Sequence, residues 1–184
     1  MANKKQGVVY ATGATAPVFF FCFFLATGVS SAQNLSKYYI NSVQSGSILY
    51  FIKPQTNFNN PKTRTDFIFD VTYLNSNDSA TINFSYFDKE NINPESITIA
   101  YSDWKYQTDL KRIYVDAKKE LWRYRYSFKI PFDQLLLFYR AQSPIITIST
   151  DSSRIITIRT VKQWEKNADI NRKIIQIIQK NKSL

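Results

Sequence analysis

The sequence contains no histidine, and its single cysteine, Cys22, lies in an apolar tract near the N-terminus. These absences exclude Ser-His-Asp and Cys-His nucleophilic catalysis, zinc sites built on imidazole or thiolate, haem ligated by His or Cys, and thiol redox chemistry outside that tract. No GxxxxGK[ST] or GxGxxG run occurs, so those phosphate-binding loops are missing too. With 44% hydrophobic and 16% aromatic residues, the chain can nevertheless build a sizeable core.

The N-terminal residues have the pattern of a secretory signal peptide. Lys4 and Lys5 precede an apolar run, Val18 to Leu25, and the small residues Ser30-Ser31-Ala32 follow it. We expect cleavage after Ala32, which makes residues 1–32 a signal peptide and residues 33–184 a single domain without a transmembrane segment. Retention of the tract as an anchor is the alternative. Cys22 lies inside the apolar run rather than directly after the cleavage position, which disfavours lipidation.

Composition also predicts the compartment of the protein and the charge of its binding partners. An exported domain without cysteine relies on its core alone, which favours a bacterial periplasm or cell surface over a eukaryotic secreted domain with disulfides. Without Lys4 and Lys5 the net charge of +10 becomes +8. Such a charge favours anionic partners, although it also simply maintains solubility. Export disfavours nucleic acid as a partner.

The clearest strand in the sequence is Leu121 to Pro131. Aromatic and aliphatic side chains alternate there with Arg123, Arg125, Ser127 and Lys129, and a pleated backbone directs the two sets to opposite faces. The strand therefore has one face for the core and one basic face.

The remaining periodicity predicts a mainly β protein, an antiparallel β-sandwich of about eight strands with two helices. A short helix is expected at about 132–141 and an amphipathic helix at about 162–182. A strand from Ser47 to Lys53 is expected to stop at Pro54, with a long loop from Gln55 to Thr65. Residues Asn34 to Ser45 look irregular. The isoleucines of the last helix could cover the protein's own sheet, dock on a partner or lie on a membrane surface.

A basic patch is the best candidate binding site in the sequence. Arg123, Arg125 and Lys129 share one strand face, and Arg112 belongs to the preceding strand. Such a patch could bind phosphates, lipopolysaccharide or an acidic glycan. A solvated sheet face whose charges discourage edge aggregation is the alternative.

Carboxylates are the main remaining basis for catalysis. Asp66 and Asp70 fall on one face of a strand, where they could act as an acid–base pair or meet basic residues across the sheet. The run DKENINP, from Asp88 to Pro94, resembles the start of a calcium loop but lacks the glycine and the distal glutamate, so a hairpin turn explains it better. A Ser-Lys dyad stays open, because any serine could meet a lysine in space, but nothing in the sequence selects one such pair. No cofactor is expected.

Four stretches together resemble small exported proteins of Bacteroidetes: the signal ending in Ala32-Gln33, SILYFIKP, DFIFDVTYLNSNDSATINFSYFDK and WRYRYSFKIPFDQLLLFY. The resemblance implies an exported address and a sandwich fold, but no activity and no site residue. We therefore expect a non-catalytic envelope protein that binds or scaffolds an envelope protein partner. Binding of an anionic glycan or lipid through the basic strand face is the alternative, and a carboxylate-dependent hydrolase is the third hypothesis.

Overall fold

The structure, a computed structural model, describes residues 35–118 and 120–182, and within them the protein is mainly β with two helices. This confirms the predicted antiparallel β class. The strands are β1 (Tyr39–Gln44), β2 (Ser47–Asn59), β3 (Asp66–Leu74), β4 (Ser79–Asp88), β5 (Pro94–Tyr101), β6 (Trp104–Asp109), β7 (Lys111–Lys118), β8 (Leu121–Pro131), β9 (Ile145–Thr150) and β10 (Ile155–Thr160). The helices are α1 (Phe132–Arg140) and α2 (Trp164–Lys182), and a 3-10 turn covers Leu35–Lys37. The predicted signal peptide lies outside the described residues.

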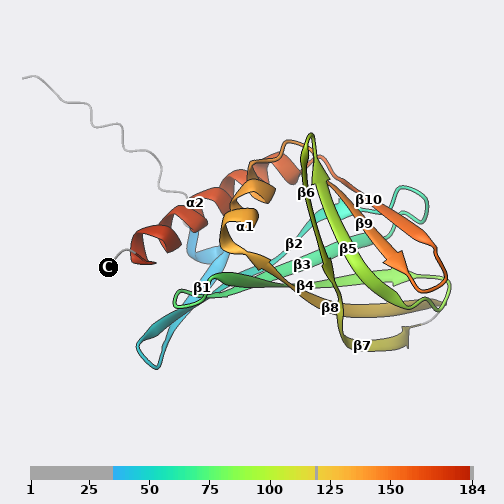
Figure 1. The fold of residues 1–184 in the computed structure, drawn as a ribbon, viewed down its shortest axis with the longest axis horizontal. Helices are drawn as coiled ribbons and strands as arrows, with labels where there is room; N and C mark the ends of the chain where they lie inside the picture. The colour runs from blue at the N-terminus through green and yellow to red at the C-terminus, as the bar shows by residue number, and fades with distance from the viewer. Residues whose placement is uncertain (1–34, 119, 183–184) are drawn as a thin grey trace, which may run out of the picture. The chain divides into compact units, whose positions relative to one another are not determined.

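All ten strands belong to one antiparallel sheet that bends round on itself (Figure 1). Its order is β6-β5-β9-β10-β2-β3-β4-β8-β7, and β1 pairs with the first half of β2. The two ends of this path approach each other, because the Tyr106 hydroxyl on β6 donates a hydrogen bond of 2.7 Å to the Lys129 carbonyl on β8. The sheet is therefore a nearly closed barrel, with ten strands rather than about eight.

The inner face of the sheet is a core of aromatic side chains. Strand β8 has the predicted bounds, and its alternate residues Tyr124, Tyr126, Phe128 and Ile130 are all buried. Phe84 of β4 stacks on Tyr126 at a centroid distance of 6.0 Å, within the range in which aromatic pairs attract beyond their buried area. The alternation that indicated a strand therefore also decides which side chains form the core.

The two helices cover the same side of the barrel (Figure 1). In α2 the buried side chains include Ile174, Ile175 and Ile178, which confirms that the isoleucine stripe packs on the protein's own sheet. Trp164 opens α2, packs against Phe58 and Phe138, and donates a hydrogen bond of 2.9 Å to the Ala141 carbonyl. Within the described residues, neither helix is both long and apolar enough to span a membrane.

The prediction that β2 ends at Pro54 was wrong, since the strand continues to Asn59. Proline lacks the N–H that a central strand needs on both sides. Here, however, β1 pairs only with residues up to Ile52, and the register between β2 and β3 shifts between Ile52 and Gln55. Pro54 thus lies at an irregular position where it is not part of a ladder pair with β1 or β3, and the strand can continue.

Two other segments were assigned wrongly. The stretch read as irregular contains β1, which pairs with β2 through a two-residue turn at Ser45 and Gly46. Both turn residues have positive φ, 48° and 79°, as a type I′ hairpin turn requires. The DKENINP run is not a hairpin turn, because β4 and β5, which it connects, pair with other strands. Neither segment has a hydrophobic pattern from which its role, as a strand or as a connection between distant strands, could be predicted.

We expect Trp164→Ala to lower the free energy of unfolding by about 3–5 kcal/mol, since it leaves a cavity between α2 and the core. Leu137→Ala is the matched control, because Leu137 lies on α1 with its side chain exposed, and its effect should stay within about 0.5 kcal/mol. Urea unfolding followed by circular dichroism measures both. Equal effects of the two substitutions would contradict the packing of α2 described here.

Candidate functional site

The predicted basic face of β8 carries charges that are largely paired with carboxylates. Arg125 forms an ion pair with Asp70 of β3 and donates a further hydrogen bond of 3.1 Å to Ser85. Asp70 is only 2% exposed, and it also accepts a hydrogen bond of 2.8 Å from Asn83. Because a buried carboxylate is tolerated only with such partners, the main role of Arg125 here is to neutralise Asp70.

The other three predicted residues do not form one patch with Arg125. Arg123 makes two hydrogen bonds to Asp116, of 3.0 and 2.7 Å, in the geometry of a bidentate pair. Lys129 is exposed on the same face. Arg112 pairs directly with Tyr126, whose side chain faces the core, and directly paired residues share one face of a sheet. Arg112 therefore lies on the face opposite to that of Arg125. The structure therefore brings together only Arg123, Arg125 and Lys129, and two of these have carboxylate partners.

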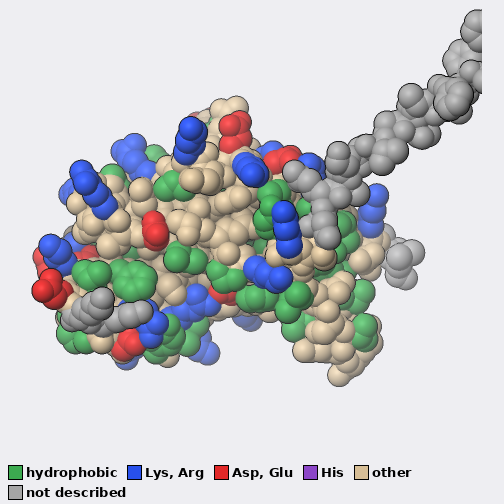
Figure 2. Space-filling view, turned by 180° about the vertical axis from the view of Figure 1, so that it is seen from behind, with side chains coloured by type: hydrophobic (Ala, Val, Ile, Leu, Met, Phe, Trp, Pro, Cys, Tyr) green, Lys and Arg blue, Asp and Glu red, His purple; other side chains and the backbone are tan. Residues whose placement is uncertain are grey.

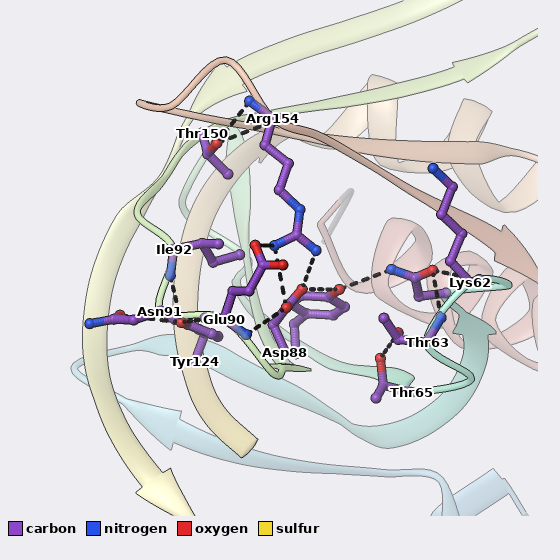
Figure 3. Close-up of polar contacts among 12 residues, drawn as sticks. Lys62, Thr63, Thr65, Asp88, Glu90, Asn91, Ile92, Tyr124, Thr150 and Arg154 are labelled. Carbon is purple, nitrogen blue, oxygen red and sulfur yellow. Dashed lines mark hydrogen bonds and ion pairs between the residues drawn. The ribbon is translucent and has the colours of Figure 1, made fainter. Parts of the chain in front are cut away.

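A second charged cluster, which the sequence did not reveal, lies where β4 ends (Figure 3). Asp88, only 1% exposed, accepts hydrogen bonds from Arg154 at 2.9 and 3.3 Å. Glu90 accepts another from Arg154 at 2.9 Å, and its own N–H donates to Asp88. Asp88 and Arg154 are 66 positions apart in the sequence, so no local spacing could have predicted their contact.

Tyr86 and Asn60 extend this cluster to the loop that connects β2 and β3. The Tyr86 hydroxyl donates to Asp88 and accepts from the Asn60 side chain, both at 2.9 Å. The Asn60 side-chain oxygen accepts the backbone N–H groups of Lys62 and Thr63, which folds the loop into a turn over its own asparagine. A continuous chain of hydrogen bonds therefore joins the loop to Arg154.

A cavity of about 340 Å³ lies beside this chain of hydrogen bonds. It is lined by residues 60–63 of the loop, by Arg154 and by residues 155–157 and Arg159 of β10. Its charged lining residues are Lys62, Arg154 and Arg159, and no acidic residue lines it. The cavity is thus the place where the described residues combine a concave surface with several positive charges.

The third notable surface is the ribbon formed by β1 and the paired part of β2, which extends beyond the rest of the sheet (Figure 1). Five of the six β1 residues are exposed, including Ile40 at 56% and Val43 at 76%. No charged residue occurs between Lys37 and Lys53. Figure 2 accordingly shows hydrophobic and uncharged polar side chains on this projection, at the lower right.

The carboxylates give little basis for catalysis in this geometry. The Asp70 carboxylate forms an ion pair with Arg125 and accepts a hydrogen bond from Asn83, while Asp66 is exposed at the start of β3. Across residues 35–118 and 120–182, no group of three or more acidic side chains is placed to hold a metal ion. Asp88 and Glu90, which resembled the start of a calcium loop, bind an arginine instead.

Burial and the hydrogen bond to Asp88 raise the pKa of Tyr86 to about 12. An unfolded tyrosine ionises near pH 10. The folded protein therefore retains a proton that the unfolded chain releases, so this contribution to stability is complete below about pH 10 and is lost as the pH rises towards 12. We expect Tyr86→Phe to flatten, but not abolish, the fall in stability between pH 10 and 12, because burial also raises the pKa of Tyr124 and Tyr126. Urea unfolding at several alkaline pH values tests this, and identical slopes would contradict it.

Removal of Arg125 should destabilise the fold strongly. We expect Arg125→Met to lower the free energy of unfolding by about 3–5 kcal/mol, because Asp70 would remain buried and unpaired. Combining it with Asp70→Asn should recover much of that loss. Arg123→Met is the control: Arg123 and Asp116 are 33% and 44% exposed, and such pairs contribute about 1 kcal/mol or less. Chemical denaturation measures all four proteins, and equal losses at the two arginines would contradict the difference in burial.

No protein-family model matches the chain, and no curated protein or solved structure gives a significant match to it. Three features of the structure are candidates for binding: the paired arginines of β8, the cavity beside Arg154 and the uncharged ribbon. Of these, the ribbon combines two exposed apolar side chains, Ile40 and Val43, with an open strand edge.

Proposed function

We propose that the protein is an exported, non-catalytic binding protein of the cell envelope, and that it holds a partner protein along the open edge of β1. The observation that carries this proposal is that β1 has a strand neighbour on one side only among the described residues. An extended segment of the partner would add a strand there through main-chain hydrogen bonds, a common mode of peptide recognition.

The register of the ribbon identifies which backbone groups face the partner. The Lys53 N–H donates to the Tyr38 carbonyl at 2.8 Å, which makes these two residues a hydrogen-bonded pair. Hydrogen-bonded and non-hydrogen-bonded pairs alternate along an antiparallel ladder. Tyr39, Asn41 and Val43 therefore direct their N–H and C=O groups away from β2, towards the open edge.

The composition of β1 also suits docking, because it lacks the usual protection of an edge strand. Natural edges are blocked by charges, proline, bulges or covering segments. The edge strand β7 has such features, with Lys111 and Arg112 at its start and a register shift between Arg112 and Tyr114. Strand β6, at the other end of the path, contacts β8 through Tyr106. Strand β1 has neither charge nor proline, and its register with β2 is unbroken. The apolar side chains of Ile40 and Val43 would supply contacts on the two faces of the ribbon.

Binding of a polyanion through the face of β8 is less well supported, since Arg123 and Arg125 are engaged by carboxylates. A partner that docks on an uncharged ribbon should resist high salt, whereas a partner held by exposed charges should be released. The salt dependence of binding therefore separates the two functions.

The first test is affinity capture of the C-terminally tagged full chain from solubilised envelope of its own host, with low-salt and then high-salt washes. The captured protein is identified by mass spectrometry, purified and titrated against the wild type and two variants. Val43→Lys, which places a charge on the open edge, should weaken binding roughly tenfold. Ile113→Lys is the control on the protected edge and should leave binding unchanged. Equal weakening by both variants, or release of the partner by salt, would overturn docking at β1.

Hydrogen exchange gives an independent test of the register. In the free protein we expect the amides of Tyr39, Asn41 and Val43 to exchange rapidly, while those of Ile40 and Ser42, which bond to β2, exchange slowly. Addition of the purified partner should protect the first three amides selectively. Protection confined to other strands would show that the partner binds elsewhere.

A further inference from the structure

The cavity beside Arg154 lies where two parts of the sheet separate. Strand β10 pairs with β2 only through Thr160 and Arg159, opposite Phe58 and Asn59. The earlier residues of β10 pair with β9 instead, and the chain after β2 turns away through residues 60–65. The space between the loop and the start of β10 is the cavity, so it follows from the path of the backbone rather than from the orientation of one side chain.

The charges around this cavity leave a net positive site. Arg154 is balanced by Asp88 and Glu90, which bind it from the side of β4. Lys62 and Arg159 are both exposed, and neither forms an ion pair within the described part of the chain. Lys62 extends from the loop between β2 and β3 (Figure 3), and Arg159 lies near the end of β10, where it pairs with Asn59. Two cations without an ion-pair partner thus line the same cavity.

The base of the site is held in place before any ligand arrives. Asn60 fixes the loop that carries Lys62, and the bonds from Asn60 through Tyr86 to Asp88 connect that loop to Arg154. Arg154 in turn lies in a tight hairpin turn, where its N–H and C=O bond with Thr150. A site whose donors are already positioned loses less entropy on binding than one that must be assembled.

The lining also indicates the kind of ligand. Pro61 and Ile155 give the cavity apolar surface beside its cations, and Ile155 is 65% exposed. A volume of about 340 Å³ is at the lower end of the range of small-molecule sites. Lysine and arginine in a lining that contains no acidic residue favour tetrahedral oxyanions, which accept several charge-assisted hydrogen bonds at once.

We infer that the cavity lined by Lys62, Arg154 and Arg159 binds a phosphate or sulfate group carried on a small organic molecule. Lys62 and Arg159 contact the anion, and Pro61 and Ile155 pack against the carbon part. Arg154 is a positioning residue, because its guanidinium is already engaged by Asp88 and Glu90. This site is separate from the β1 edge, so either can fail without the other.

Calorimetric titration of the full chain with inorganic phosphate, at constant ionic strength, tests the inference. We expect saturable binding with a stoichiometry near one, competed by inorganic sulfate. Lys62→Gln and Arg159→Gln should each weaken it about tenfold, the size expected for loss of one charged hydrogen-bonding partner. Both residues are exposed, so thermal melting should show that each variant remains folded.

Lys129→Gln is the matched control, since it removes one exposed positive charge from the face of β8. It should leave phosphate binding unchanged. A loss in this variant equal to that in Lys62→Gln would show that only general charge matters, and would overturn the cavity as the site. Binding that does not saturate, or that persists in the double variant of Lys62 and Arg159, would overturn it as well.

Discussion

The fold depends on β2, a single strand whose neighbours change along its length. Along one edge, the first half of β2 pairs with β1 and its end pairs with β10. Along the other edge, β2 pairs with β3. Among the described residues, β2 alone joins the strands β9 and β10 to β3 and β4, and so it allows one sheet to bend into a nearly closed barrel. The irregular register around Pro54 lies between the two pairings, where the strand can bend without losing a ladder of hydrogen bonds.

Both proposed binding surfaces arise from this exchange of neighbours. Because β1 pairs with only the first half of β2, the resulting ribbon projects from the barrel and leaves one edge open. Because β10 meets β2 only at its end, a space remains between β10 and the following loop. In each place the sheet is discontinuous, and a discontinuity in a sheet exposes backbone groups or space that a ligand can occupy.

Positive charge in this protein has two distinct roles. Arg125 and Arg154 neutralise the buried carboxylates Asp70 and Asp88, and each pair connects strands that are far apart in the sequence. The intact pairs add little net stability, because burial of the charges costs nearly as much as their attraction returns, but loss of either arginine would leave a buried carboxylate unpaired. Lys62 and Arg159, by contrast, are exposed around a cavity, where their charge is available to a ligand. A count of basic residues cannot separate these roles, since the distinction depends on where each carboxylate lies.

The periodicity of the sequence was enough to predict the antiparallel β class, the bounds of β8 and the positions of both helices. These features follow from periodicity, which each segment carries within itself. The three-dimensional fold was needed to establish the continuation of β2 past Pro54, the pairing of β1, the burial of the isoleucine stripe of α2 and the engagement of Arg123 and Arg125 by carboxylates. It also decided the contact between Asp88 and Arg154, residues 66 positions apart, because the partner of a polar side chain depends on how distant strands are ordered in the sheet.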